Sequence, residues 1–181
     1  MPQAREPVAK LEMEKSQVET LIKSGLIVAG LLGLMCSFVH PYGPVKSLKS
    51  DKPSLDGVAI NPAIAQVLER SCQNCHSERT EWPWYSYIAP ISWLIEKDVQ
   101  DGRSHMNLSR WEAYTPDEQV EILTKLGVEV RNRRMPLPQY LRLHPETKLS
   151  DEDVQQLYLW AHRERRRLET PVDPTPKIPT D

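Results

Sequence analysis

The sequence contains the pentapeptide Cys72-Gln73-Asn74-Cys75-His76, its most informative stretch. It has the C-x-x-C-H form of a covalent attachment site for a c-type haem. Two thiols separated by two residues can each bond one vinyl group on the same haem edge, and the next residue can then bind the iron. The pattern therefore predicts one covalent haem attached through Cys72 and Cys75, with His76 as the proximal iron ligand.

The same two cysteines could instead form half of a zinc site, a thioredoxin-like redox pair or a buried disulfide. A zinc ribbon needs a second Cys or His pair at similar spacing, and none follows in the sequence. A thioredoxin-like motif needs βαβ surroundings, which the flanking residues do not indicate. We therefore interpret the motif as a haem attachment site.

Composition indicates one globular domain with appendages. The 181 residues are 39% hydrophobic, which can support a modest core, and the net charge is −2 with acidic and basic residues mixed along the chain. Nucleic-acid binding needs a one-sided basic surface, and this charge pattern does not predict one. We expect no nucleic-acid partner.

A stretch without charge runs over 16 residues from Ser24 to Val39, and Leu21 and Ile22 extend it beyond Lys23. A bilayer core needs about 20 apolar residues, with tolerance down to about 17, and Lys23 can reach the interface with its long side chain. A cleaved signal peptide is the alternative, but no A-x-A-like site follows. The sequence predicts an N-terminal arm at residues 1–20 and an uncleaved transmembrane helix at 21–39.

Charges on the two sides of this helix are similar in number, so they do not set its orientation. The haem motif does, because bacteria attach haem to such cysteines outside the inner membrane. We therefore expect a single-pass protein of the bacterial inner membrane with its haem domain in the periplasm.

The remaining chain divides into a proline-containing linker at 40–60, a haem-binding domain at 61–169 and a disordered tail at 170–181. Four helices are expected in the domain. Their predicted starts are Asn61-Pro62, Pro90, Thr115-Pro116 and Ser150, and the second is expected to stop near Gly102. No alternating run is long enough to require a sheet, so the predicted fold class is all-α.

The iron needs a ligand on its other side, and Met135 is the strongest candidate. It opens Met135-Pro136-Leu137-Pro138, where the prolines restrict the backbone, and it lies 59 residues after His76. Met135 could instead fill a gap in the core. His144, before Pro145, is the alternative distal ligand. We expect His105, Met106 and His162 to be surface or supporting groups.

Aromatic residues follow the motif closely. Trp82, Trp84 and Tyr85 could form a wall of the haem crevice, although packing in an ordinary core is the alternative. Arg79, Arg103 and the cluster Arg131, Arg133 and Arg134 could neutralise haem propionates, although a solvated charged surface is the alternative.

Taken together, the chain resembles the bacterial haem-binding domain family of c-type cytochrome-like proteins. The resemblance extends over about Asn61 to Arg167 and lies in CQNCHSERTEWPWYSYIAPISWLIEKDVQDGR (72–103), NLSRW (107–111), MPLPQYLRLHP (135–145) and the Leu-Ser-Asp-Glu start of the last helix. It implies one haem c on Cys72 and Cys75 with His76 as proximal ligand, and either Met135 or His144 facing the iron. The order of these elements is also similar to small soluble cytochromes c, which implies a cytochrome c-like helical domain.

Iron held by His and Met needs little rearrangement between oxidation states. We therefore expect electron transfer to or from a redox partner protein, rather than catalysis. A haem-based sensor or ligand-binding module is the alternative if Met135 does not hold the iron. A peroxidase-like enzyme would need a distal acid-base group such as His105 or His144.

Overall fold

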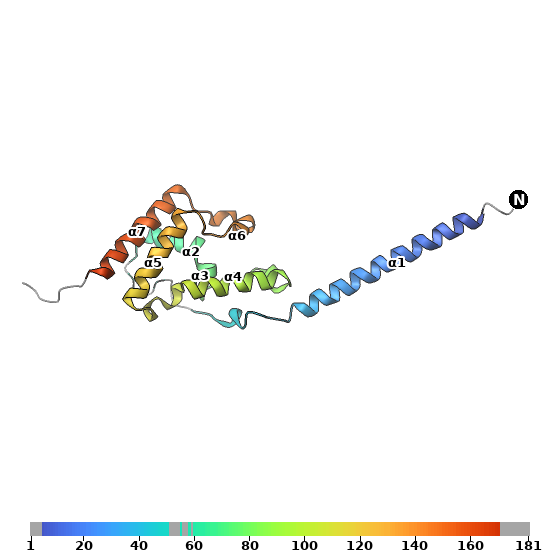
Figure 1. Cartoon of the computed structure of the whole chain (residues 1–181), viewed down its shortest axis with the longest axis horizontal. Helices are drawn as coiled ribbons and strands as arrows, with labels where there is room; N and C mark the ends of the chain where they lie inside the picture. The colour runs from blue at the N-terminus through green and yellow to red at the C-terminus, as the bar shows by residue number, and fades with distance from the viewer. Residues whose placement is uncertain (1–4, 51–54, 56–57, 59, 171–181) are drawn as a thin grey trace, which may run out of the picture. The chain divides into compact units, whose positions relative to one another are not determined.

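The computed structural model describes residues 5–50, 55, 58 and 60–170, and every element in these ranges is helical (Figure 1). This confirms the predicted all-α fold class. The helices are α1 (Arg5–Cys36), η1 (Val45–Ser47), α2 (Pro62–Ser71), α3 (Gln73–His76), η2 (Trp84–Tyr87), α4 (Ile91–His105), η3 (Leu108–Ala113), α5 (Pro116–Arg131), α6 (Pro138–Leu143), η4 (Pro145–Thr147) and α7 (Asp151–Glu169).

Helix starts follow the capping residues read from the sequence. The side chain of Asn61 accepts a hydrogen bond from Ala63 N (2.8 Å), with Pro62 at the first position of α2. Thr115 and Ser150 each form a capping box, with an acidic residue at the third position of α5 and α7. These three predicted starts are confirmed.

The carboxyl group in the capping box of α7 belongs to Asp153. Partial burial raises the pKa of Asp153, but hydrogen bonds from Ser150 and the nearby Arg70 guanidinium outweigh this and lower the pKa below its usual value. Arg70 Nη2 lies 2.9 Å from Asp153 Oδ2, so the same carboxylate also links α2 to α7.

The predicted stop of the second domain helix near Gly102 is wrong, because α4 continues to His105. Glycine weakens a helix without ending it when tertiary contacts hold the backbone on both sides. At Gly102 the reason for glycine is a close approach of α4 to Cys75, described below.

The chain forms two compact units. The N-terminal unit consists of Met1–Gly43 and Trp82–Glu96, and the haem-motif unit consists of Pro44–Glu81 and Lys97–Asp181. In the haem-motif unit α5 and α7 lie side by side, and α2 also packs on α7 (Figure 1). Its core is a single cluster of buried side chains that includes Leu68, Leu108, Trp111, Leu123, Leu126, Leu157 and Trp160.

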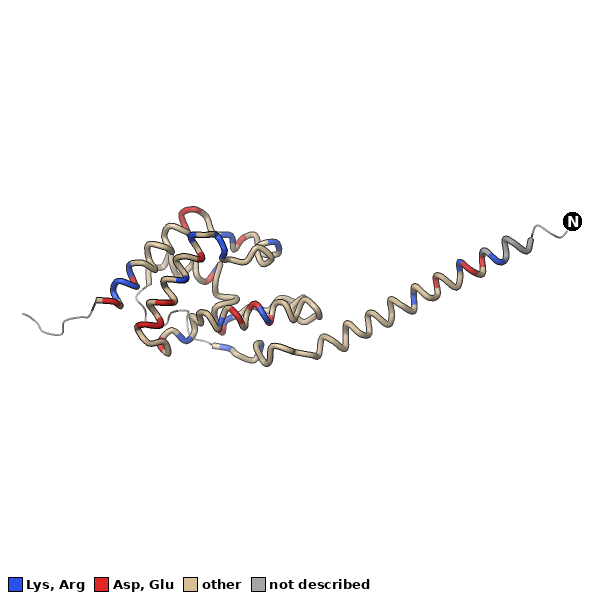
Figure 2. The backbone as a smooth tube through the Cα atoms, viewed as in Figure 1, with Lys and Arg blue, Asp and Glu red and all other residues tan. Residues whose placement is uncertain are grey.

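Helix α1 dominates the N-terminal unit. Its residues Glu12–Cys36 are long and apolar enough to cross a membrane, with mean hydropathy 1.7, and a signal sequence would satisfy the same criterion. Figure 2 shows the charged residues toward the N-terminal end of α1, and the sequence has no charged residue between Lys23 and the end of the helix.

The described part of the predicted linker is not entirely exposed. Val45 and Leu55 in it are buried, at 6% and 2% exposure, and Leu55 belongs to the core cluster. Residues 51–54, 56, 57 and 59 of that linker lie outside the described residues, as does the predicted disordered tail beyond Thr170.

Candidate haem site

The haem motif lies on a single helical turn in the haem-motif unit. Helix α2 ends at Ser71, Cys72 leaves helical geometry, and α3 begins at Gln73. Cys72 O accepts hydrogen bonds from Cys75 N (3.3 Å) and His76 N (2.9 Å). This turn gathers both thiols and the imidazole, as attachment at one haem edge requires.

His76 is oriented by the backbone of the residue after α4. Its Nδ1 lies 3.2 Å from Met106 O, and because a carbonyl oxygen only accepts, Nδ1 carries the proton. Burial lowers the pKa of His76, so the ring is neutral at physiological pH. A neutral ring protonated at Nδ1 presents the lone pair of Nε2, the tautomer that a metal-binding histidine uses.

Both cysteines are free, partly buried thiols. Burial raises the pKa of Cys72 to about 12 and that of Cys75 to about 11. Such thiols are protonated at neutral pH, unlike the low-pKa thiolate of a thioredoxin-like site. Within the part of the chain that the structure describes, no three His, Cys, Asp or Glu side chains converge as a metal site would require. The raised pKa values of the two thiols disfavour the redox alternative.

Helix α4 passes unusually close to the motif at Gly102. A Cβ built on Gly102 would lie 2.5 Å from Cys75 O, 3.0 Å from Cys75 C and 3.2 Å from Cys75 Cβ. No side chain fits at such distances, so glycine is required for α4 to support the turn that carries the thiols.

Asn74, inside the motif, connects it to three other positions. Its Nδ2 donates to Tyr140 Oη (2.9 Å) on α6, its Oδ1 accepts from Glu81 N (3.0 Å), and its backbone oxygen accepts from Thr80 Oγ1 (2.7 Å). The contact to Tyr140 spans 66 residues of sequence. Asn74 therefore links the motif both to the segment that follows it and to α6, which lies between Met135 and His144.

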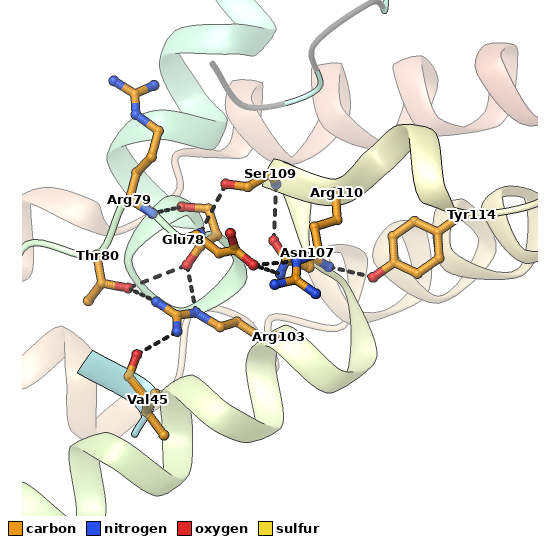
Figure 3. A network of polar contacts seen from close by, with 10 residues as sticks. Val45, Glu78, Arg79, Thr80, Arg103, Asn107, Ser109, Arg110 and Tyr114 are labelled. Atoms are coloured by element: carbon orange, nitrogen blue, oxygen red, sulfur yellow. Dashed lines mark hydrogen bonds and ion pairs between the residues drawn. The ribbon is translucent and has the colours of Figure 1, made fainter. Parts of the chain in front are cut away.

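Arg103 holds the same segment from below (Figure 3). This buried guanidinium donates from Nε to Ser77 O (2.8 Å), from Nη1 to Val45 O (2.8 Å) and from Nη2 to Thr80 Oγ1 (3.0 Å). Three charge-assisted hydrogen bonds to the backbone and a hydroxyl give Arg103 a structural role, and its predicted contact with a propionate stays a prediction.

Glu78 continues this network away from Arg103. Its Oε1 accepts from Asn107 Nδ2 (3.2 Å) and pairs with Arg110, and its backbone N donates to Ser109 Oγ (3.0 Å). Figure 3 shows these contacts running from the segment after the motif to the start of η3, where Asn107 N donates to Tyr114 Oη (2.9 Å).

The chain enters the Met135 segment through a Schellman motif at the end of α5. Arg133 has φ 57°, Arg133 N donates to Val130 O (3.1 Å), and Arg134 N donates to Glu129 O (3.0 Å). The Arg133 guanidinium also donates to Leu149 O (2.7 Å), before α7. Met135 follows, partly buried and in the same unit as His76.

His144, the alternative distal ligand, is partly buried at the end of α6. Its ring stacks on that of Tyr140 with centroids 4.4 Å apart, and its Nδ1 lies 3.3 Å from Glu146 Oε1. Because Tyr140 also bonds Asn74, the structure links His144 to the haem motif through one intervening ring.

The other candidate residues lie as follows. His105 is exposed, whereas the side chain of Met106 is buried in the core at 8% exposure, so of the two expected alternatives Met106 is a supporting group and not a surface residue. Its carbonyl supports His76. Trp82, Trp84 and Tyr85 belong to the N-terminal unit, and their predicted role in a haem crevice stays a prediction.

The roles of Asn74, Gly102 and Tyr140 were not identified from the sequence, and for Met106 the sequence did not indicate that its carbonyl contacts His76. Their roles depend on contacts made over 27 or more residues, such as the approach of Gly102 to Cys75, which no local pattern reveals. The only local signal was Gly102 itself, a glycine within an otherwise helical pattern, which can mark close packing.

Comparison with known proteins supports a haem-binding domain. The haem-binding domain family matches residues 31–163. "Cytochrome c peroxidase Ccp" of Escherichia coli (strain K12) is 28% identical over 180 residues, covering 87% of this chain and 38% of that protein. The chain thus spans well under half of that relative. No solved structure matches the chain. Because the family match includes the motif and extends over more than half of the sequence, this chain belongs to the haem-binding domain family.

Proposed function

We propose that the protein is a membrane-anchored c-type cytochrome that carries one covalent haem c and transfers electrons on the periplasmic side of the bacterial inner membrane. Cys72 and Cys75 form the thioether links, His76 is the proximal iron ligand and Met135 the distal one. The observation that carries this proposal is the hydrogen bond between His76 Nδ1 and Met106 O.

That hydrogen bond orients His76 for iron binding before haem is attached. It sets the tautomer and limits rotation of the ring, and a polarised Nδ1–H makes Nε2 a better donor. Burial keeps the ring neutral, because it lowers the pKa of His76. A fixed, neutral imidazole beside two thiols suits haem c better than a surface histidine would.

Bound haem supplies an iron centre that gains and loses one electron. The approach of Gly102 to Cys75 and the hydrogen bonds of Asn74 to Tyr140 and of Arg103 to Ser77 would hold the surroundings of that iron in place. A thioether from Met135 favours reduced iron and raises the potential. Such rigid surroundings favour electron transfer because little has to move with each electron.

The anchor and the partner complete the proposal. Helix α1 as an uncleaved span would hold the domain at the membrane surface, where tethering raises the effective concentration of membrane-bound partners. The partner is a redox protein, and the mixed charge of the chain gives no basis for nucleic-acid binding.

Absorption and magnetic spectra of protein matured with haem test the ligand set. We expect low-spin, six-coordinate iron in both oxidation states of the wild type. Met135→Ala should give high-spin iron, while His144→Ala, the matched control, should keep the wild-type spectrum. The reverse result would assign His144 as the distal ligand, and high-spin iron in the wild type would contradict the electron-transfer proposal.

Mass spectrometry of the same material tests the covalent link. Wild-type protein should carry one added haem mass that survives denaturation, and Cys72→Ser with Cys75→Ser should lose it. A bare polypeptide mass from a host competent in haem attachment would refute the proposal.

A peroxidase-like or ligand-binding function is the second candidate, favoured by the relative called a cytochrome c peroxidase. It requires an open iron position, which Met135 would occupy. Carbon monoxide binding at low concentration, or peroxide turnover that survives Met135→Ala and fails in His144→Ala, would support it. Wild-type protein that neither binds carbon monoxide nor turns over peroxide would exclude this second candidate.

A further inference from the structure

The N-terminal unit contains a second stretch without charged residues, besides Ser24 to Val39. Residues 82–95 include 14 consecutive positions without a charged residue or histidine. Five of its large side chains are exposed: Trp84 is 75% exposed, and exposed fractions of 46–55% are found at Tyr87, Ile88, Ile91 and Leu94. Its other large side chains are partly buried: Trp82, Tyr85, Trp93 and Ile95. We call residues 82–95 the interfacial segment.

The buried positions of the interfacial segment are small or polar. Ser86, Ala89 and Ser92 are buried, and Glu96, directly after the segment, is only 1% exposed. This polarity is the reverse of that expected in water, where large apolar residues are buried and carboxylates exposed. Large apolar side chains outside and polar ones inside suit a surface that meets an apolar medium.

Hydrogen bonds join the interfacial segment to the chain that leaves α1. Ala89 N donates to Ser37 Oγ (3.1 Å), and Trp93 Nε1 donates to Val39 O (2.8 Å). His40 Nδ1 lies 2.9 Å from Glu96 Oε1. The residues that make these contacts, Ser37, Val39 and His40, directly follow Cys36, the last residue of the candidate span. The exposed apolar side chains of the interfacial segment are therefore joined to the end of the span.

The residue types of the interfacial segment are those found at the boundary between a bilayer and water. Trp and Tyr are enriched at membrane–water interfaces because one end of each ring system is apolar and the other is polar. Phe38, which adjoins Ser37, is also 75% exposed. The interfacial segment has no Lys or Arg, so its affinity would come from apolar burial and not from attraction to anionic lipid.

We propose that the interfacial segment lies in the headgroup region of the bilayer, with Trp84, Tyr87, Ile88 and Ile91 toward the acyl chains. The inference rests on the proposed membrane anchoring by α1. The interfacial segment would give the protein a second contact with the membrane. The N-terminal unit would then lie on the bilayer surface in addition to being anchored by α1.

Depth measurement on the haem-matured full chain tests this. In a Cys36→Ser background, a spin label is placed at Tyr87→Cys or, as the control, at Glu121→Cys, an exposed position on α5. The protein is reconstituted into phosphatidylcholine vesicles. We expect the label at 87 to lose collisions with a water-soluble nickel complex and gain collisions with oxygen, relative to 121 and independently of salt.

The outcomes separate this inference from the anchor on which it rests. Protein that sediments with vesicles while both labels are equally open to nickel keeps the anchor and overturns the interfacial segment. Protein recovered in the supernatant overturns both. If position 87 is open to nickel and Trp84→Ser with Ile88→Ser shifts the haem absorption spectrum, the exposed side chains cover haem, and the proposal is wrong.

Discussion

Replacing Gly102 by alanine should destabilise the protein, although alanine is the better helix former. In a helix interior, Ala is favoured over Gly by about 1 kcal/mol. The new Cβ would lie 2.5 Å from Cys75 O and 3.0 Å from Cys75 C, which are backbone atoms of the motif turn and cannot rotate aside. Overpacking of this kind costs about 1–3 kcal/mol, and more where the backbone must shift.

Since the contact at Gly102 is with backbone, we take the upper part of that range and expect a net loss of about 2 kcal/mol in the free energy of unfolding. For a domain of this size that corresponds to a fall in melting temperature of about 10 °C. The shift of α4 away from Cys75 should also lower the yield of attached haem.

Gly127→Ala is the matched control, because Gly127 is also a buried glycine inside a long helix, α5. There the new Cβ would lie 3.4 Å from Tyr158 Cδ2, an ordinary van der Waals distance. We expect Gly127→Ala to be neutral or to gain up to about 1 kcal/mol. Urea unfolding of holoprotein in mild detergent, followed by circular dichroism, measures both. If Gly102→Ala is as stable as Gly127→Ala, the close-approach argument is wrong.

Other substitutions test the caps and the polar links. Thr115→Ala should cost about 1 kcal/mol by removing the cap of α5, whereas Thr124→Ala, at an exposed position of the same helix, should not; urea unfolding compares them. Folding lowers the pKa of Asp153, so its carboxylate stabilises the fold above an unfolded-state pKa of about 3.9, and this contribution is lost as pH falls through the folded-state pKa. Asp153→Asn should therefore be less stable than wild type at neutral pH, and unfolding measured against pH should show the difference vanish in strong acid. Tyr140→Phe removes the acceptor for Asn74 and should cost about 1 kcal/mol with the haem spectrum retained; no change in melting temperature would show that this link is dispensable.

Sequence by itself determined the features that depend on neighbouring residues. The spacing of Cys72, Cys75 and His76 identified the haem motif, and Asn61, Thr115 and Ser150 marked helix starts, because capping and attachment each involve residues within a few positions. The length of the apolar stretch likewise identified α1 as a candidate span.

Tertiary structure alone decided what supports the motif. Arg103 could have been read as a propionate partner, Met106 as a surface residue and Gly102 as a helix stop, since none of these residues differs locally from a solvated or terminal one. Their roles arise when segments about 30 residues apart meet: Arg103 with Ser77, Met106 with His76, and Gly102 with Cys75. Contacts of this kind depend on how helices pack, and helix packing is a property of the folded chain and not of any short stretch within it.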